Sequence, residues 1–87
     1  MRKTTLFRKL INDTEILLMP GVHDTLSARI GEQVGFKSMT AGGYSTSATL
    51  LGEPDTSQLS LSEMADQYAR LCDAVDVPFF GDGDTGF

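Results

Sequence analysis

Short apolar runs along this chain alternate with longer segments in which apolar residues recur at helical spacing. The runs at 16–19 and 77–80 show no polar alternation, which predicts short strands buried on both faces, and 36–41 is expected to be a further strand between them. The helical spacing predicts a leading helix from about residue 6 and a helix between each pair of successive strands. The predicted order is therefore helix, then strand–helix–strand–helix–strand, with parallel strands and right-handed crossovers.

Capping residues mark the ends of the first two predicted helices. Thr4 or Thr5 is the expected N-cap of the leading helix, and Asn12-Asp13 is its expected end. Asp24 is expected to cap the second helix, and Gly35 stands where a left-handed C′ residue would end it. One face of this second helix carries Leu26, Ile30 and Val34.

The clearest predicted helix begins after Ser60. Ser60 and Glu63 have the spacing of a capping box, and the positions that follow repeat an apolar face. Cys72 shares this face with Tyr68, so we interpret it as a small buried hydrophobic residue rather than a nucleophile. The segment before this helix, residues 42–59, is predicted to be a long loop.

Polar residues follow each predicted strand: His23 and Asp24, then the segment 44–55, then Asp82 and Asp84. Two architectures fit the order of elements, a doubly wound sheet and a (β/α)₈ barrel, and in both the functional residues lie at the C-terminal ends of strands. The local pattern leaves that choice open. We interpret His23 as a packing or hydrogen-bonding residue at a strand end, with contact to substrate as the alternative.

Composition and charge narrow the classes of function. The chain has 87 residues and a net charge of −5, which argues against nucleic acid or an anionic membrane as a partner. The apolar runs are too short for a secretory signal core or a membrane-spanning helix. A single cysteine forms no internal disulfide. We therefore expect a cytoplasmic protein whose partner is a small molecule.

Residues 81–87, Gly-Asp-Gly-Asp-Thr-Gly-Phe, are the most informative part of the chain. Asp82 and Asp84 lie two positions apart after an apolar run, and residues i and i+2 of extended backbone project to the same side. Both carboxylates can therefore point at one hard cation. The alternative is a pair of turn formers, since Asp-Gly is an ordinary turn dipeptide. The segment lacks the preceding helix and the closing Glu of a calcium-binding EF-hand, so calcium is not expected.

Three segments follow the predicted strands in order: 20–29, beginning Pro-Gly-Val-His-Asp-Thr; 43–55, from Gly-Tyr to Leu-Gly-Glu-Pro-Asp; and 81–87. Together they resemble the isocitrate lyase/phosphoenolpyruvate mutase superfamily, especially its small methylisocitrate lyase and dimethylmalate lyase members. The resemblance spans residues 6–87. It implies an α/β fold, the N-terminal part of a (β/α)₈ TIM barrel, with residues 1–87 forming one segment of a single domain truncated after the third strand.

The resemblance also implies roles for individual residues. Family members hold Mg²⁺ through the Asp-x-Asp pair, which corresponds to Asp82 and Asp84. A further carboxylate in the loop after the second strand supports the metal and corresponds to Asp55, which could instead be a solvated turn residue. The Gly-Tyr segment of the family approaches the substrate carboxylate, largely through backbone N–H groups. That segment corresponds to Gly42, Gly43 and Tyr44.

The expected function is Mg²⁺-dependent cleavage of a carbon–carbon bond in a 2-alkylmalate or methylisocitrate-type acid, giving an α-keto acid by a retro-aldol step. The ligand would be a small 2-oxo or 2-hydroxy carboxylic acid, and the full-length protein is expected to be a homo-oligomer. No catalytic acid or base is assigned, because the lyases carry much of this function on a later loop with a Lys and a Cys. The alternatives are a phosphonate-forming mutase or an oxaloacetate decarboxylase on the same scaffold, or a non-catalytic fragment. The 87 residues alone are expected to be inactive.

Overall fold

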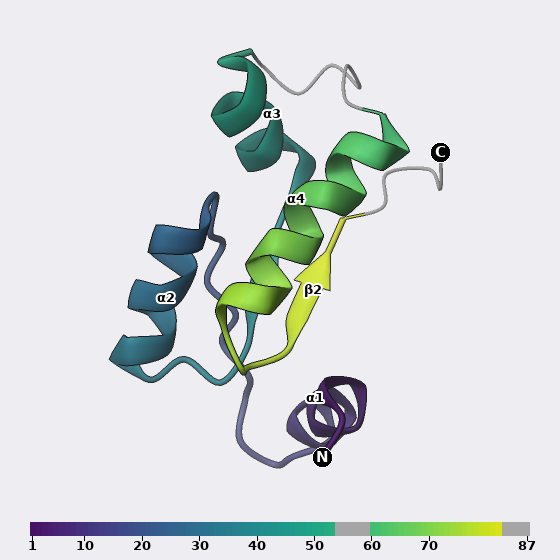
Figure 1. Cartoon of the computed structure of the whole chain (residues 1–87). Coiled ribbons are helices and arrows are strands. Elements are labelled where there is room, and N and C mark those ends of the chain that lie inside the picture. Colours follow the sequence, from purple (N-terminus) through teal and green to yellow (C-terminus); the bar gives the residue numbers. More distant parts are fainter. Residues whose placement is uncertain (54–59, 83–87) are drawn as a thin grey trace.

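The computed structural model describes residues 1–53 and 60–82 (Figure 1). Strands β1 (Met39–Ala41) and β2 (Phe79–Gly81) pair in parallel, with Met39 opposite Phe79. Helices α2 and α4 pack against each other and against the strands, whereas α3 lies at the C-terminal end of the strands and α1 at the opposite end (Figure 1). The helices are α1 (Lys3–Ile11), α2 (Thr25–Val34), α3 (Gly43–Leu51) and α4 (Leu61–Ala74).

Local hydrogen bonds explain where α2 and α4 begin. The Asp24 carboxylate accepts the N–H of Ser27 at 2.8 Å, and the Ser27 hydroxyl oxygen accepts the N–H of Asp24 at 3.2 Å. This reciprocal pair is a capping box, and Ser60 and Glu63 form the same arrangement at the start of α4. Gly35 ends α2 at φ 112, a left-handed conformation that favours glycine. These capping predictions are confirmed.

The hydrophobic core lies between the strands and the two helices α2 and α4. Gly31 lets α2 come close to β1, because a Cβ at this position would lie 2.8 Å from the sulfur of Met39. The face of α2 that carries Leu26, Ile30 and Val34 points away from this core, and each of these side chains is more than 50% exposed. The core consists of Val22, Ala28, Met39, Ala41, Leu71 and Val75.

The predicted strand at 16–19 does not form. Sheet pairing begins instead at an isolated parallel bridge between Gly21 and Thr40. The N–H of Val22 donates to the carbonyl of Thr40 at 2.9 Å, and the N–H of Thr40 donates to the carbonyl of Pro20 at 3.0 Å. Pro20 takes part only as an acceptor, as its missing N–H requires. The other two strand predictions are confirmed in shortened or shifted form, 36–41 as β1 and 77–80 as β2.

The predicted loop at 42–59 is wrong in its first half, where α3 forms. Its sequence of glycine, serine and threonine has low helix propensity, which explains the wrong prediction. In the structure the hydroxyls of Ser45 and Thr46 donate to the carbonyl of Gly42 at 3.1 and 2.8 Å. Gly43, Thr46 and Ser47 are buried, so packing against the rest of the molecule compensates for weak propensity.

Helix α1 is fastened to the N-terminal end of the sheet by its side chains. The Lys3 ammonium donates to the carbonyls of Cys72 at 2.6 Å and Val75 at 2.7 Å, where α4 ends. The ring of Phe7 stacks on that of Phe80, with 6.1 Å between centroids. Cys72 is half-buried beside this helix. α1 therefore packs across the end of the sheet that lies away from the strand C-termini.

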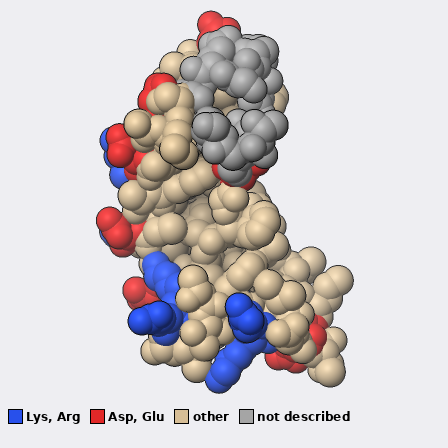
Figure 2. All heavy atoms as spheres, turned by 90° about the vertical axis from the view of Figure 1, so that its right-hand side faces the viewer, with Lys and Arg blue, Asp and Glu red and all other residues tan. Residues whose placement is uncertain are grey.

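Helix α1, like α3, begins without a side-chain capping bond. Arg2 occupies the N-cap and makes no side-chain capping bond, so the prediction of Thr4 or Thr5 as the cap is wrong. Basic side chains gather at the bottom of the face in Figure 2, the end of the molecule where Figure 1 places α1.

Within residues 1–53 and 60–82, no helix has the length and apolar character needed to cross a membrane.

Candidate functional site

The C-terminal ends of β1 and β2 bring two of the predicted site segments together. Gly42 follows β1 directly, and Asp82 follows β2. The N–H of Gly43 donates to Oδ2 of Asp82 at 3.3 Å. The N–H of Asp82 in turn donates to the carbonyl of Ala41 at 3.2 Å, which continues the strand pairing by one residue. A predicted metal ligand and a predicted substrate-binding glycine are therefore hydrogen-bonded to each other.

The predicted substrate-binding residues form the start of α3. Gly42 is the N-cap in extended conformation, and Gly43 is the buried first residue of the helix. Tyr44 is 70% exposed, so it does not serve as a core residue in the described part of the chain. The N–H groups in the first turn of a helix have no acceptor within it and carry the positive end of the helix dipole. The Asp82 carboxylate thus sits where negative charge is favoured.

The structure describes only one of the three predicted metal ligands. Asp55 and Asp84 lie outside the described residues, and Asp82 lies within them, half-buried at the end of β2. In the segments 1–53 and 60–82, no three His, Cys, Asp or Glu side chains are grouped so that they could hold a metal ion. Mg²⁺ takes only one or two protein carboxylates and keeps several waters. The hard oxygen donors of Asp82 fit this ion, and its metal role stays a prediction.

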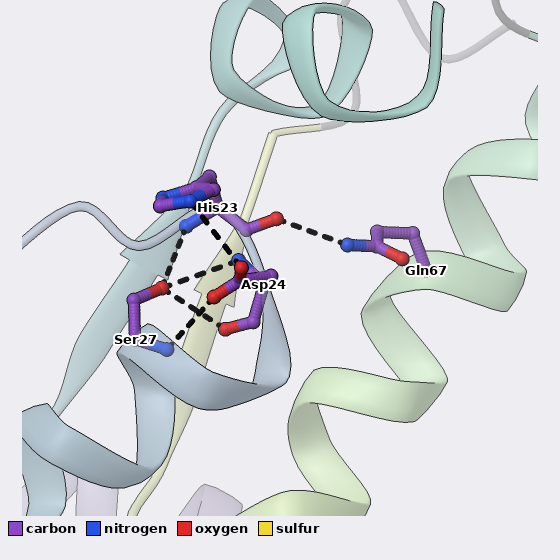
Figure 3. Close-up of polar contacts among 4 residues, drawn as sticks. All are labelled: His23, Asp24, Ser27 and Gln67. Carbon is purple, nitrogen blue, oxygen red and sulfur yellow. Dashed lines mark hydrogen bonds and ion pairs between the residues drawn. The ribbon is translucent and has the colours of Figure 1, made fainter.

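His23 lies at the end of the first strand segment, in a network with the α2 cap (Figure 3). Its backbone N–H donates to the hydroxyl of Ser27 at 3.3 Å, and its carbonyl accepts the side-chain amide of Gln67 at 3.1 Å. The imidazole Nε2 lies 3.3 Å from Oδ2 of Asp24 and is largely exposed. The N–H and then the hydroxyl of Ser27 lower the pKa of the Asp24 carboxyl. Asp24 is therefore an ionised helix cap, and the hydrogen-bonding interpretation of His23 is confirmed.

Helix α4 contributes two residues to the site that the sequence analysis missed. Gln67 is only 5% exposed and holds the His23 carbonyl. Tyr68 donates its hydroxyl to the backbone carbonyl of Asp82 at 2.9 Å. A signal for Gln67 was present, because it lies three residues after Met64 and four before Leu71 on the buried face. A polar side chain at such a position needs a hydrogen-bond partner.

Comparison with known proteins identifies the family. The family model described as phosphoenolpyruvate phosphomutase matches residues 7–87. The chain belongs to the phosphoenolpyruvate mutase/isocitrate lyase superfamily. Over 98% of its length it is 44% identical to the chloroplastic carboxyvinyl-carboxyphosphonate phosphorylmutase of Arabidopsis thaliana, of which it covers 25%.

Solved structures of this superfamily superpose closely on the chain. Oxaloacetate acetylhydrolase gives a TM-score of 0.90 at 36% identity, over 98% of this chain and 31% of the other. The triclinic form of 2,3-dimethylmalate lyase, described as a superfamily member, gives 0.86 at 31% identity, again over 98% of this chain and 31% of the other. The chain thus spans between 25% and 31% of the length of these relatives. Their fold confirms that the described elements belong to a (β/α)₈ barrel.

Proposed function

We propose that the protein carrying this chain is a Mg²⁺-dependent carbon–carbon lyase that cleaves a 2-alkylmalate or methylisocitrate-type acid to an α-keto acid. The observation that carries this proposal is the 3.3 Å contact between the Asp82 carboxylate and the Gly43 N–H. It joins a carboxylate, the kind of oxygen donor that hard cations prefer, to a helix N-terminus at the end of the strands where barrel enzymes carry their active sites. A cation and an anionic acid would both find complementary groups there.

The proposed metal ligands are Asp82, Asp84 and Asp55, the last two from segments outside the described residues. When bound, Mg²⁺ would supply positive charge for the oxygen atoms on which negative charge develops as the carbon–carbon bond breaks. Asp82 suits this role because the bonds to Ala41 and Gly43 fix both its backbone and its carboxylate. A carboxylate held in advance loses little conformational freedom when it binds a ligand.

Gly42, Gly43 and Tyr44 are proposed to seat a carboxylate of the substrate. Because Asp82 occupies the Gly43 N–H, the seat would use the following N–H groups in the first turn of α3, at Tyr44 and Ser45. The exposed side chain of Tyr44 lies on the same turn and could line the bound acid. This arrangement lets one helix end face both the metal ligand and the substrate anion.

Retro-aldol cleavage requires two proton transfers. A base takes the proton of the substrate hydroxyl, the oxygen becomes a carbonyl, and the electron pair of the broken bond passes to the leaving carbon. An acid then protonates that carbon, so the products are an α-keto acid and a second carboxylic acid. Neither transfer is assigned to a residue of this chain.

A phosphonate-forming mutase and an oxaloacetate decarboxylase are kept as alternatives, because the names of two relatives reported above contain a phosphonate and oxaloacetate. The 44% identity to a phosphorylmutase favours phosphonate chemistry, and the TM-score of 0.90 to oxaloacetate acetylhydrolase favours oxaloacetate as a substrate. The natural gene product should be assayed with Mg²⁺ and 2,3-dimethylmalate, 2-methylisocitrate, oxaloacetate or phosphonopyruvate. Pyruvate release from either of the first two acids supports the lyase. Turnover of oxaloacetate or of phosphonopyruvate alone would replace it with the matching alternative.

The metal assignment has its own test in the same protein. Asp84→Ala should reduce turnover to background while circular dichroism and the melting temperature stay close to those of the parent, because only a metal ligand is lost. Asp73→Ala is the matched control. It removes an exposed carboxylate near the C-terminus of α4, at the end of the helix that lies away from the C-terminal ends of the strands. An Asp84→Ala variant that keeps its activity would contradict the assignment.

A further inference from the structure

Asp82 is held by three separate elements of the fold. Its N–H bonds to Ala41 of β1, its carboxylate accepts the Gly43 N–H of α3, and its carbonyl accepts the Tyr68 hydroxyl of α4 at 2.9 Å. Asp82 lies one residue beyond β2, and its bond to Ala41 extends the strand pairing by one step. The bond to Ala41 holds the peptide before the Asp82 Cα, and the bond from Tyr68 holds the peptide after it.

Tyr68 is itself fixed by close packing. A Cβ added to Gly81 would lie 3.0 Å from ring atoms Cδ2 and Cε2 of Tyr68, so the ring lies directly against the last residue of β2. The same helix is tied to the first strand segment by its neighbour, because Gln67 donates to the His23 carbonyl at 3.1 Å. The Tyr68 hydroxyl is therefore held in place by the packing of its own ring and by the attachment of α4 to the first strand segment.

We propose that Tyr68 is a positioning residue for Asp82. Its hydroxyl fixes the Asp82 peptide and so keeps the carboxylate at the start of α3, ready to hold a divalent cation. The inference rests on the proposed metal role of Asp82. It goes beyond that role in assigning the geometry of Asp82 to a side chain on α4 that is not itself one of the proposed metal ligands or substrate-binding residues.

The test compares two variants that each remove one hydroxyl bonded to a backbone carbonyl of the same strand region. Tyr68→Phe removes the bond to Asp82 and keeps the ring on Gly81. Ser38→Ala removes the buried bond from Ser38 to the Pro78 carbonyl, which is 3.0 Å long and lies at the opposite end of the strands. Mn²⁺ alone is titrated into the natural gene product, and free Mn²⁺ is followed by electron paramagnetic resonance.

Tyr68→Phe should weaken Mn²⁺ binding by about two- to tenfold, the range that one ordinary hydrogen bond is worth. Ser38→Ala should lower the melting temperature by a similar amount as Tyr68→Phe while leaving Mn²⁺ affinity unchanged. Equal weakening by both variants, or unchanged affinity in Tyr68→Phe, would overturn the positioning role. Asp82→Asn is measured in parallel. If it binds Mn²⁺ as well as the parent does, the metal role of Asp82 fails, and that result is distinct from a failure of the positioning role alone.

Discussion

The contact between Gly81 and Tyr68 leads to a quantitative prediction for Gly81→Ala. Carbon atoms in contact prefer separations of about 3.5–4.0 Å. An alanine Cβ at this position would lie 3.0 Å from two ring atoms of Tyr68 and 3.5 Å from a third. The ring cannot retreat freely, because it packs against the core and its hydroxyl is bonded to Asp82. The substitution therefore overpacks the junction between α4 and β2.

Two opposing effects set the size of the change in the free energy of unfolding. Overpacking of a close contact costs about 1–3 kcal/mol. Gly81 does not have a positive φ, so alanine restricts the unfolded chain without backbone strain and stabilises by about 0.4–1 kcal/mol. The net expectation is a destabilisation of roughly 1 kcal/mol, with a range of about 0–2.6 kcal/mol.

A double-mutant cycle isolates the clash from the other effects. In a Tyr68→Ala background the ring is gone, so Gly81→Ala should become neutral or stabilising, and the coupling energy should be about 1–3 kcal/mol. In a Tyr68→Phe background the ring atoms stay, so Gly81→Ala should cost about as much as in the parent. Each variant is measured by chemical denaturation of the natural gene product. An equal cost of Gly81→Ala in the Tyr68→Ala and parent backgrounds would refute the packing argument.

Two further predictions concern the core and the α2 cap. Leu71→Ala should destabilise by about 2–5 kcal/mol, because Leu71 is fully buried. Asp73→Ala on the exposed face of the same helix should change stability by less than about 0.5 kcal/mol in the same denaturation assay, and equal costs would contradict the assigned core. The hydrogen bonds from Ser27 lower the pKa of Asp24 in the folded state below its ordinary value of 3.8. The ionised carboxylate therefore contributes its full stabilisation at pH values above that ordinary pKa. This contribution is lost as the pH falls through the folded-state pKa. The melting-temperature difference between the parent and Asp24→Asn should therefore shrink between pH 7 and pH 3, and a constant difference would argue against it.

The sequence predicted those parts of the fold in which local chemistry decides the outcome. The two capping boxes and the left-handed Gly35 depend on residues within one turn of each other, so their signals can be read directly. The strand at 16–19 was predicted wrongly because an apolar run does not reveal pairing register. Ile16 and Leu18 are largely exposed, and the pairing falls on Pro20, Gly21 and Val22. Helix α3 was missed because burial of small residues, which propensity does not include, stabilises it.

The candidate site, like the fold, was predicted only in part. The positions of Gly42 and Asp82 at the ends of parallel strands follow from element order, and the 3.3 Å contact between Gly43 and Asp82 agrees with this expectation. The roles of Gln67 and Tyr68 did not follow from it. Both donate to backbone carbonyls of segments distant in the sequence, and a backbone acceptor leaves no signature in residue type.

The neighbouring positions of Gln67 and Tyr68 on α4 have a consequence for how such a site can change. One helix holds a carbonyl at the end of the first strand segment and another at the end of β2, so a small tilt of that helix displaces both ends at once. Leu71 lies one turn further along α4, and its fully buried side chain fixes the position of the helix on the core. Substitutions in the core beneath α4 can therefore shift the backbone carbonyls that this helix holds at the C-terminal ends of the strands. In evolution, core substitutions could therefore change the distance between the site segments while every residue that contacts the ligand stays the same.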